Sequence, residues 1–245
     1  MGVGIWFLKR CQLLERLTDS ELQQLESRSL LRRFRRSTPV YLPSEACDAV
    51  FLLTKGRVKI CYLTPDGRQS ILGFVEPGEV FGESALVDPH SQREEYAETV
   101  EASEIVWLPG DIIRKIAEQN PALSLGITRL IGLRRKRVER RLRHLLFLPT
   151  KKRLCHLILE LAEDYGKETP EGIALSIRLS HQDLAAVIGA TRETVTVLLG
   201  ELQGDGLIQV GRRRITVVDM DRLAELVEVA PPAPKSDVQQ SPAET

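Results

Sequence analysis

The chain has 245 residues, 42% of them hydrophobic, which is enough for two domains that each bury a sizeable core. Its 34 basic and 34 acidic residues cancel to a formal net charge of zero, so a histone-like polycation is excluded and any nucleic-acid affinity must come from local clusters of charge. The apolar run in MGVGIWFLKR is too short for a signal peptide, and no apolar stretch has membrane length. We therefore expect a cytoplasmic protein with no membrane partner.

The cysteines stand singly, at positions 11, 47, 61 and 155, without a CxxC pair. This spacing argues against a zinc ribbon, a redox dithiol or an iron–sulfur cluster held by local ligands. We expect reduced, mostly packed thiols and no metal site.

The N-terminal half alternates short apolar runs with turn residues. The segment DSELQQLESRSL comes first and has helical periodicity, with Asp19 or Ser20 as the expected cap, and we expect it to pack on the outside of the β-structure that follows. Between residues 38 and 115 the runs are TPVYL, AVFLLTKG, RVKICYL, SILGFVEPG, EYAETVEA and EIVWLPG. They predict antiparallel strands closed into a roll or barrel.

A long helix is predicted after Asn120, where Pro121 suits the first turn. Its apolar residues recur near heptad spacing, which favours pairing with a second copy of the chain over packing on the roll. The predicted dimer interface consists of Leu123, Ile127, Ile131 (or its neighbour Leu130), Val138, Leu142 and Leu145. The basic segments 134–144 and 151–153 are interpreted mainly as a solvated face, and LPTKKR, 148–153, is predicted to be a hinge.

Two short helices meeting at a corner are predicted in LSHQDLAAVIGATRETVTVLLGEL, residues 179–202. Gly189 can take the positive φ that the corner needs, and Ala185 is small where the second helix presses on the first. Ser180 and Thr191 are the expected caps. This helix-turn-helix places Arg192 and Glu193 on the first turn of the helix that enters a DNA major groove.

A small wing is expected to follow, because Gly204-Asp205-Gly206 ends the second helix and LIQV, GRRR and ITVVD are typical of strand, turn and strand. The predicted DNA-binding residues are Ser180, His181, Gln182, Thr191, Arg192, Glu193, Thr194, Thr196, Arg212, Arg213 and Arg214. The alternative is an ordinary helix pair in an α-helical domain, with the arginine turn simply solvated. Polar side chains at the start of the second helix favour DNA.

The order of these parts resembles the Crp/Fnr family of bacterial transcription regulators, over roughly residues 12–222. The resemblance is carried by PGEVFGESAL at 77–86, NPALS at 120–124 and the helix-turn-helix block. It implies an α+β fold: a cyclic-nucleotide-binding-like β-roll (jelly roll) with its N-terminal helix in residues 1–119, a dimerisation helix in 120–149 and a winged helix-turn-helix in 150–230. The Pro-rich polar segment 231–245 is expected to be a disordered tail.

The resemblance further implies a homodimer that binds double-stranded DNA at a roughly palindromic operator near a promoter, with RNA polymerase as a partner and a small effector in the roll. Many relatives carry a second arginine where this chain has Val197, so a half-site near, but not identical to, the family's TGTGA or GTA-type boxes is expected.

Cyclic AMP is disfavoured as the effector. The family's cyclic AMP sensors hold its phosphate with a glycine-glutamate pair, an arginine ten residues after the glutamate and a serine directly after it. Gly82, Glu83 and Arg93 keep this pattern, but Glu94 replaces the serine and would repel a phosphate. In the long helix, Val138 and Glu139 stand where those sensors offer hydroxyls.

Other cofactors are not supported either. The iron–sulfur members need a cysteine cluster near the N-terminus, and the haem members use a histidine near Ser84, whereas the roll holds only His90. The nitrogen-control branch, which senses 2-oxoglutarate, is closest in pattern because Arg134 and Glu139 match an arginine and a glutamate five residues apart. Since seven of the ten residues 134–143 are Arg or Lys, that match is weak evidence.

The predicted effector-binding residues are Phe81, Gly82, Glu83, Ser84, Ala85, Arg93, Arg134 and Glu139, with 2-oxoglutarate or another small anion as ligand. In the alternative, Arg93 pairs with a neighbouring glutamate, Glu83, Glu94 or Glu95, in a loop that binds nothing. As an anion anchor, Arg93 would be replaceable by alanine without loss of folding. A cupin-like enzyme would need clustered histidines, and a regulated catalytic domain would need more chain, so no enzyme is expected.

Overall fold

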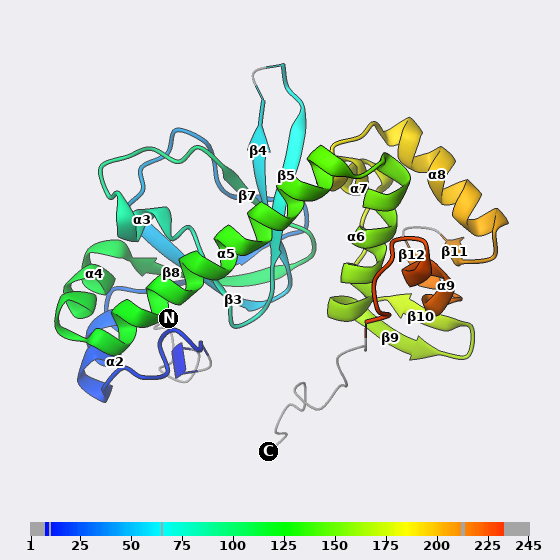
Figure 1. The fold of residues 1–245 in the computed structure, drawn as a ribbon. Coiled ribbons are helices and arrows are strands. Elements are labelled where there is room, and N and C mark those ends of the chain that lie inside the picture. Colours follow the sequence, from blue (N-terminus) through cyan, green and yellow to red (C-terminus); the bar gives the residue numbers. More distant parts are fainter. Residues whose placement is uncertain (1–7, 10, 65, 212–213, 233–245) are drawn as a thin grey trace. The chain divides into compact units, whose positions relative to one another are not determined.

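The computed structural model describes residues 8–9, 11–64, 66–211 and 214–232 (Figure 1). The chain forms two compact units, Met1–Arg140 and Arg141–Thr245. The division falls inside the predicted long helix, α5 (Pro121–Phe147), so the first unit contains most of that helix and the second contains its last two turns.

The β-structure of the first unit consists of two four-stranded sheets in which every pairing is antiparallel. One sheet has the order β1 (Leu30–Phe34), β8 (Ser103–Pro109), β3 (Ala49–Lys55), β6 (Val80–Phe81), and the other β2 (Pro39–Tyr41), β7 (Tyr96–Thr99), β4 (Val58–Leu63), β5 (Gln69–Val75). Strand β1 begins before the expected residue 38 because its backbone pairs with β8 over its whole length. The β-structure ends at Pro109, because helix α4 (Gly110–Gln119) begins there.

Strand β3 is buried on both faces, which explains why AVFLL holds no polar residue. Ala49, Phe51 and Leu53 point into the core between the two sheets. Val50 and Leu52 point into a second core under the helices. The strand therefore ties the sandwich to the helical layer.

Helices α2 (Asp19–Glu26), α3 (Ser84–Val87) and α4 cover this second core. The cap of α2 is Thr18, so the prediction of Asp19 or Ser20 was wrong. The Thr18 hydroxyl accepts a hydrogen bond from the Glu21 amide at 3.3 Å, and the Glu21 carboxylate accepts one from the Thr18 amide at 2.7 Å. This reciprocal pair satisfies two amides, whereas a cap one residue later would satisfy fewer.

Helix α5 begins at Pro121, as predicted, and the Asn120 side chain caps it by accepting from the amides of Ala122 and Leu123 at 3.1 and 3.2 Å. Leu123 is only 1% exposed because it packs into the helical core of its own roll. Its assignment to the dimer interface was therefore wrong. Ile127 is partly buried on the same core. Further along α5 the predicted interface residues are exposed: Ile131, Val138, Leu142 and Leu145.

The second unit begins with the end of α5 and continues directly into α6 (Thr150–Tyr165), so the predicted hinge 148–153 shrinks to Leu148 and Pro149. Next come the hairpin β9 (Gly166–Thr169) and β10 (Gly172–Leu175), then α7 (His181–Ile188) and α8 (Arg192–Gly204), and finally β11 (Ile208–Gly211), β12 (Arg214–Val217) and α9 (Met220–Glu225). The wing hairpin joins β9 and β10 in one sheet of order β11-β12-β10-β9. The sequence did not predict α6 or the β9–β10 hairpin.

The four cysteines are free and buried, as predicted. Burial raises the pKa of the Cys11, Cys61 and Cys155 thiols to about 11, so they are protonated at neutral pH. Within the described ranges, no helix is long and apolar enough to cross a membrane, and no group of three metal-ligating side chains gathers.

Candidate DNA-binding surface and effector site

The first helix of the pair, α7, is fixed at both ends. Its N-cap Ser180 and Asp183 form a capping box, in which the Ser180 hydroxyl accepts from the Asp183 amide at 3.1 Å and the Asp183 carboxylate accepts from the Ser180 amide at 2.9 Å. Its C-cap Gly189 has φ 65°, the left-handed conformation expected for the corner. Ala185 is fully buried, and α7 packs against the second helix. The predicted helix-turn-helix is therefore confirmed in each of its capping and corner residues.

The corner also meets the end of the long helix. A Cβ atom at Gly189 would lie 2.9 Å from Cδ2 of Leu145, which is on the last turn of α5 and belongs to the same unit. Leu145 remains 40% exposed. A residue predicted for the dimer interface thus also lies at the corner of the helix-turn-helix.

The second helix, α8, buries Val195, Leu199 and Leu202 and leaves its N-terminal face in solvent. Arg192 and Glu193 are exposed there, and no ion pair of the described residues includes either of them. The cap Thr191 accepts from the Thr194 amide at 3.1 Å, and the two threonine hydroxyls lie 3.0 Å apart. The Thr194 hydroxyl is therefore engaged within the cap, while the two charged side chains are available to bases.

Two further predicted residues meet across the helix pair. Nδ1 of His181, the first residue of α7, lies 2.8 Å from the Thr196 hydroxyl on α8. The Thr196 hydroxyl also donates to the Arg192 carbonyl at 2.9 Å. Gln182, beside His181, is exposed. The sequence predicted these residues one by one as DNA contacts, whereas their connection depends on the helix packing.

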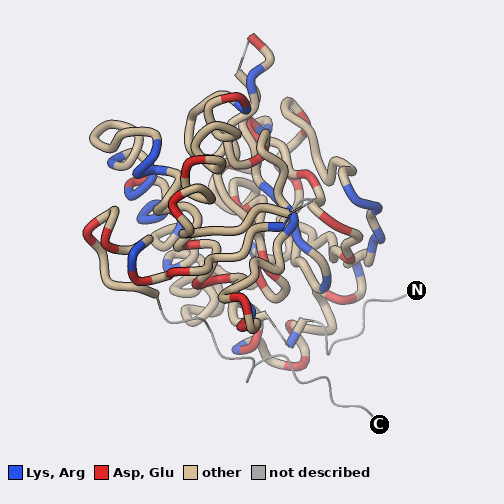
Figure 2. Tube along the Cα trace, turned by 90° about the vertical axis from the view of Figure 1, so that its right-hand side faces the viewer, with Lys and Arg blue, Asp and Glu red and all other residues tan. Residues whose placement is uncertain are grey.

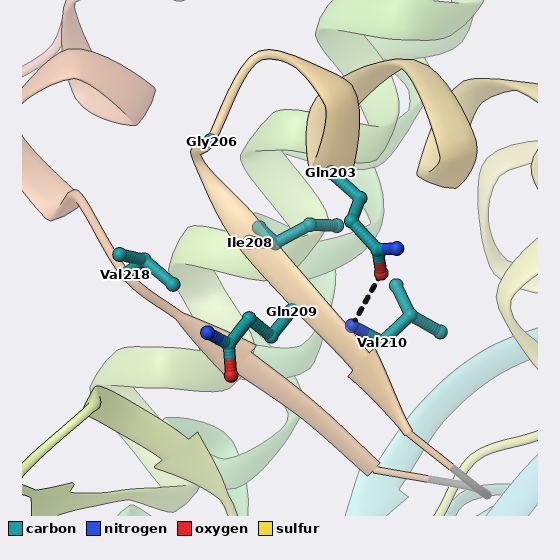
Figure 3. A pocket seen from close by; sticks show the side chains of 6 residues that line it. All are labelled: Gln203, Gly206, Ile208, Gln209, Val210 and Val218. Atoms are coloured by element: carbon teal, nitrogen blue, oxygen red, sulfur yellow. Dashed lines mark hydrogen bonds between the residues drawn. The ribbon is translucent and has the colours of Figure 1, made fainter.

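A hydrogen bond connects the wing to the second helix, α8. The backbone amide of Val210 on β11 donates to Oε1 of Gln203 at 2.9 Å (Figure 3). This bond crosses a shallow hollow of about 460 Å³, lined by Gln203, Gly206, Ile208, Gln209, Val210 and Val218. Arg214 is exposed at the start of β12, and Arg212 and Arg213 lie outside the described residues. The predicted phosphate contact can thus be placed on the structure for Arg214 alone.

Figure 2 shows both signs of charge distributed along the chain, in keeping with the zero net charge. Two basic residues near the start of α6 form ion pairs: Lys151 with Glu201 on α8 at 3.0 Å, and Lys152 with Glu228 at 2.9 Å. The hydrogen bond to Glu201 raises the pKa of Lys151. Carboxylates of neighbouring elements therefore engage both of these lysines.

In the first unit, Arg93 is buried, with 3% of its surface exposed. Its Nη2 donates to the Ala49 carbonyl at 2.7 Å, and the guanidinium stacks 4.1 Å above the Tyr41 ring. Its Nη1 is buried without a hydrogen-bond partner and would lie 2.9 Å from a Cβ at Gly82. A buried donor of this kind costs free energy unless an acceptor reaches it, which makes the space beside Gly82 the candidate anion site.

The turn after Gly82 is linked to the long helix. Glu83 forms an ion pair with Arg134 on α5, and the Val80 carbonyl accepts a hydrogen bond from the same guanidinium. Burial lowers the pKa of Arg134 to about 10, because keeping the guanidinium charged in this position costs free energy. The predicted effector residues Phe81 and Ala85 are buried, and the Ser84 hydroxyl lies 3.6 Å from the Cys47 thiol. Gly82, Glu83, Arg93 and Arg134 therefore come together as one site.

Glu139 lies apart from this site, as a half-exposed residue of α5 paired with Arg135 at 3.2 Å. Glu94 is exposed and Glu95 accepts from the Tyr41 hydroxyl at 3.2 Å. No ion pair among the described residues includes Arg93, so the alternative of a loop-fixing pair is wrong. Because Arg93 is buried, its replacement by alanine is also expected to affect folding, unlike the expectation from the sequence.

Sequence reasoning missed the aromatic support of Arg93. Tyr41 and Phe51 come from β2 and β3, and the guanidinium lies 4.1 and 5.3 Å from their rings. Nothing in the local sequence marks these residues, because they reach Arg93 only when the two sheets are packed.

A winged helix-turn-helix in the same chain as a double-sheet roll defines a DNA-binding regulator with an additional roll domain. Comparison with protein families agrees: residues 31–120 match the cyclic nucleotide-binding domain and residues 152–226 match the Crp-like helix-turn-helix domain. The chain belongs to the Crp/Fnr family and is a DNA-binding transcription regulator of that type.

Among its relatives is the CRP-like cAMP-activated global transcriptional regulator of Mycobacterium tuberculosis, 29% identical over 89% of this chain and 96% of the relative. The global nitrogen regulator of Synechococcus elongatus is 30% identical over 80% of this chain and 88% of the relative. The solved structure of the c-di-GMP responsive regulator CLP of Xanthomonas campestris is similar in fold, with a TM-score of 0.74 and 23% identity over 82% of this chain and 99% of that chain.

Proposed function

We propose that this regulator acts as a homodimer on a roughly palindromic operator, that RNA polymerase is its partner at the promoter, and that a small anion bound in the roll controls its DNA affinity. The observation that carries the control is the buried, unpartnered Nη1 of Arg93 beside Gly82. Next to it, the Glu83–Arg134 pair joins this site to α5.

Support for the dimer comes from apolar side chains that α5 leaves in solvent. Val138 is 54% exposed, Leu142 53% and Ile131 38%, and exposed leucines continue at positions 133 and 146. A helix of 27 residues is about 40 Å long at 1.5 Å per residue, which gives room for several layers of contact with a second copy. Packing these side chains against the same side chains of a second copy would remove apolar surface from water, which favours association.

Two copies would supply two recognition helices, which suits an operator with two half-sites about one turn of DNA apart. On each α8, the exposed Arg192 matches guanine O6 and N7, and Glu193 accepts from cytosine N4. Val197, 61% exposed on the same helix, offers no hydrogen bond but can contact a thymine methyl.

The anion that fits best carries two carboxylates, as 2-oxoglutarate does. One carboxylate would accept from Arg93 Nη1, and the other would replace Glu83 as the partner of Arg134. Because Arg134 is on α5, such a replacement changes a contact between the roll and the long helix. Cyclic AMP fits less well, since Glu94 follows Arg93 and Glu83 is already paired.

The test is a selection from random-sequence duplexes, followed by titration of the enriched duplex with and without 2-oxoglutarate, cyclic AMP and succinate. A motif with two-fold symmetry is expected, together with an affinity change of about 5- to 150-fold caused by 2-oxoglutarate alone. A motif without symmetry would contradict the dimer. A response to cyclic AMP alone would contradict the choice of a dicarboxylate, and a response to none of the three would contradict control by an anion in the roll.

A further inference from the structure

The contact between His181 and Thr196 fixes the proton on one nitrogen of the imidazole ring. The Thr196 hydroxyl has one proton, and its oxygen lies 2.9 Å from the Arg192 carbonyl and 2.8 Å from His181 Nδ1. A carbonyl can only accept, so the hydroxyl proton must go to Arg192 for that contact to be a hydrogen bond. The threonine oxygen then accepts from Nδ1, which must carry a hydrogen. Both contacts are satisfied only in this arrangement.

The consequence is that only Nε2 changes when His181 titrates. In the neutral ring Nδ1 holds the proton, and Nε2 is a bare acceptor. In the cation Nε2 becomes a second donor while the bond to Thr196 is kept. Histidine is the side chain that makes this change near neutral pH.

The position of the ring determines which groups of the DNA lie near Nε2. His181 is the first residue of α7, and the first helix of a helix-turn-helix crosses the DNA backbone, where the groups presented are phosphate oxygens. A neutral Nε2 acceptor repels a phosphate oxygen, whereas a protonated one donates a charge-assisted hydrogen bond to it. Resting on the proposed function, we infer that His181 takes up a proton when the helix-turn-helix binds DNA, so that operator affinity rises as pH falls.

The charged residues around the ring come from each neighbouring element. Arg178 precedes α7 and is exposed, and the Asp183 carboxylate accepts from the Ser180 amide and hydroxyl at 2.9 and 2.6 Å. On α8 the charged residues of the first turn are Arg192 and Glu193. Helix α6 packs against both helices: its Lys151 pairs with Glu201 on α8 at 3.0 Å, and Nη1 of Arg153 would lie 3.8 Å from a Cβ at Gly189. Among the described residues, the hydrogen-bond partner of the His181 ring is Thr196.

Proton linkage fixes the direction in which DNA affinity changes with pH. Bound phosphate stabilises the imidazolium, so the complex binds more protons than the free protein, and affinity is gained as pH falls and lost as pH rises. Each proton taken up changes the affinity by up to about tenfold per pH unit for each protomer bound. The effect depends on a titratable side chain at position 181 and on the hydroxyl of Thr196.

The experiment titrates the selected duplex with the full-length protein at constant ionic strength between about pH 8 and about pH 6. Wild type should gain at least about threefold in affinity per pH unit in part of this range. His181→Gln and His181→Asn should lose most of that slope, because neither amide titrates. His90→Gln, which removes an exposed histidine of the other unit, should keep it.

The hydroxyl is tested separately. Thr196→Ser should keep the slope, since serine preserves the relay. Thr196→Val should reduce the slope, because Nδ1 then has no acceptor and the neutral ring can carry its hydrogen on Nε2.

Calorimetry of DNA binding by wild type, in two buffers of different ionisation enthalpy, should count the protons taken up by the complex. This measurement tests proton uptake even if the His181 variants bind DNA too weakly to titrate. Equal slopes in wild type and His181→Gln, or no proton uptake by wild type, would overturn the inference while leaving sequence-specific binding intact. Failure to enrich any duplex would instead refute the proposed function.

Discussion

Arg134 on the long helix α5 forms an ion pair with Glu83, the residue directly after Gly82 in the roll. Both side chains are partly buried, and the same guanidinium also binds the Val80 carbonyl. In the proposed function, an incoming carboxylate would compete with Glu83 for Arg134, so the pair would set how strongly an anion is bound and how α5 responds.

We expect Glu83→Gln to strengthen binding of 2-oxoglutarate by about fivefold. The substitution removes a negative charge whose repulsion of the bound carboxylate costs roughly 1 kcal/mol. It should also raise DNA affinity in the absence of effector, since the link between roll and α5 is weakened. Calorimetry and DNA titration measure the two effects. Glu118→Gln, which removes an exposed carboxylate from α4, serves as the control and should change neither.

Arg93 is expected to lower the stability of the folded protein, although it provides the binding of the anion. Its charge is buried with one nitrogen unpartnered, and replacing a buried charge by an apolar side chain of similar size is often neutral or stabilising. Arg93→Met should therefore keep or raise the midpoint of thermal unfolding but abolish the response to 2-oxoglutarate. Arg93→Ala should lower the midpoint, because it leaves a cavity over Tyr41.

The matched control is Arg32→Met, which removes an exposed arginine of β1 and should leave both properties unchanged. Thermal unfolding followed by circular dichroism, combined with the DNA titration, separates folding from response. An effector response that survives in folded Arg93→Met would show that the anion binds elsewhere.

The dimer prediction concerns Val138, 54% exposed on α5. Val138→Asp would place two carboxylates in an apolar seam, where an unpaired charge is strongly unfavourable, and should convert the dimer to monomer at micromolar concentration. Sedimentation velocity measures the change. Thr128→Asp, an exposed polar position of the same helix, is the control; a Val138→Asp protein that sediments as a dimer would place the interface elsewhere.

Base recognition is tested at Arg192 and Glu193, both exposed on the first turn of α8. Replacing either by alanine should cost about 1–3 kcal/mol of discrimination at one base position in each half-site. A competition assay with single-base variants of the selected duplex measures this loss. Glu168→Ala on β9 should have no such effect, and a uniform loss over all duplexes would indicate a backbone contact instead.

The helix-turn-helix was predictable because its signals are local. Ser180 and Thr191 cap their own helices, and Gly189 takes a positive φ that its own backbone demands, so each acts over a few residues of chain. The start of α5 at Pro121 and the Gly82-Glu83 turn were found for the same reason. In contrast, the α2 cap was predicted one or two residues too late, because adjacent polar residues compete for that role and the bond to Glu21 decides between them.

What the sequence by itself determined is therefore the β-roll, the long helix and the winged helix-turn-helix in that order, the exposed charges of α8 and the arginine of the roll. Only the tertiary structure decided which partners these residues have. Leu123 follows the same periodicity as Val138, yet it is buried in its own roll, because α2 and α4 lie over that end of α5. Arg93 receives Tyr41 and Gly82 as neighbours, and His181 receives Thr196, from segments 11 to 52 positions away in the sequence. Local patterns encode helices and turns through short-range hydrogen bonds, whereas the environment that sets a charge or a proton is created by packing between elements.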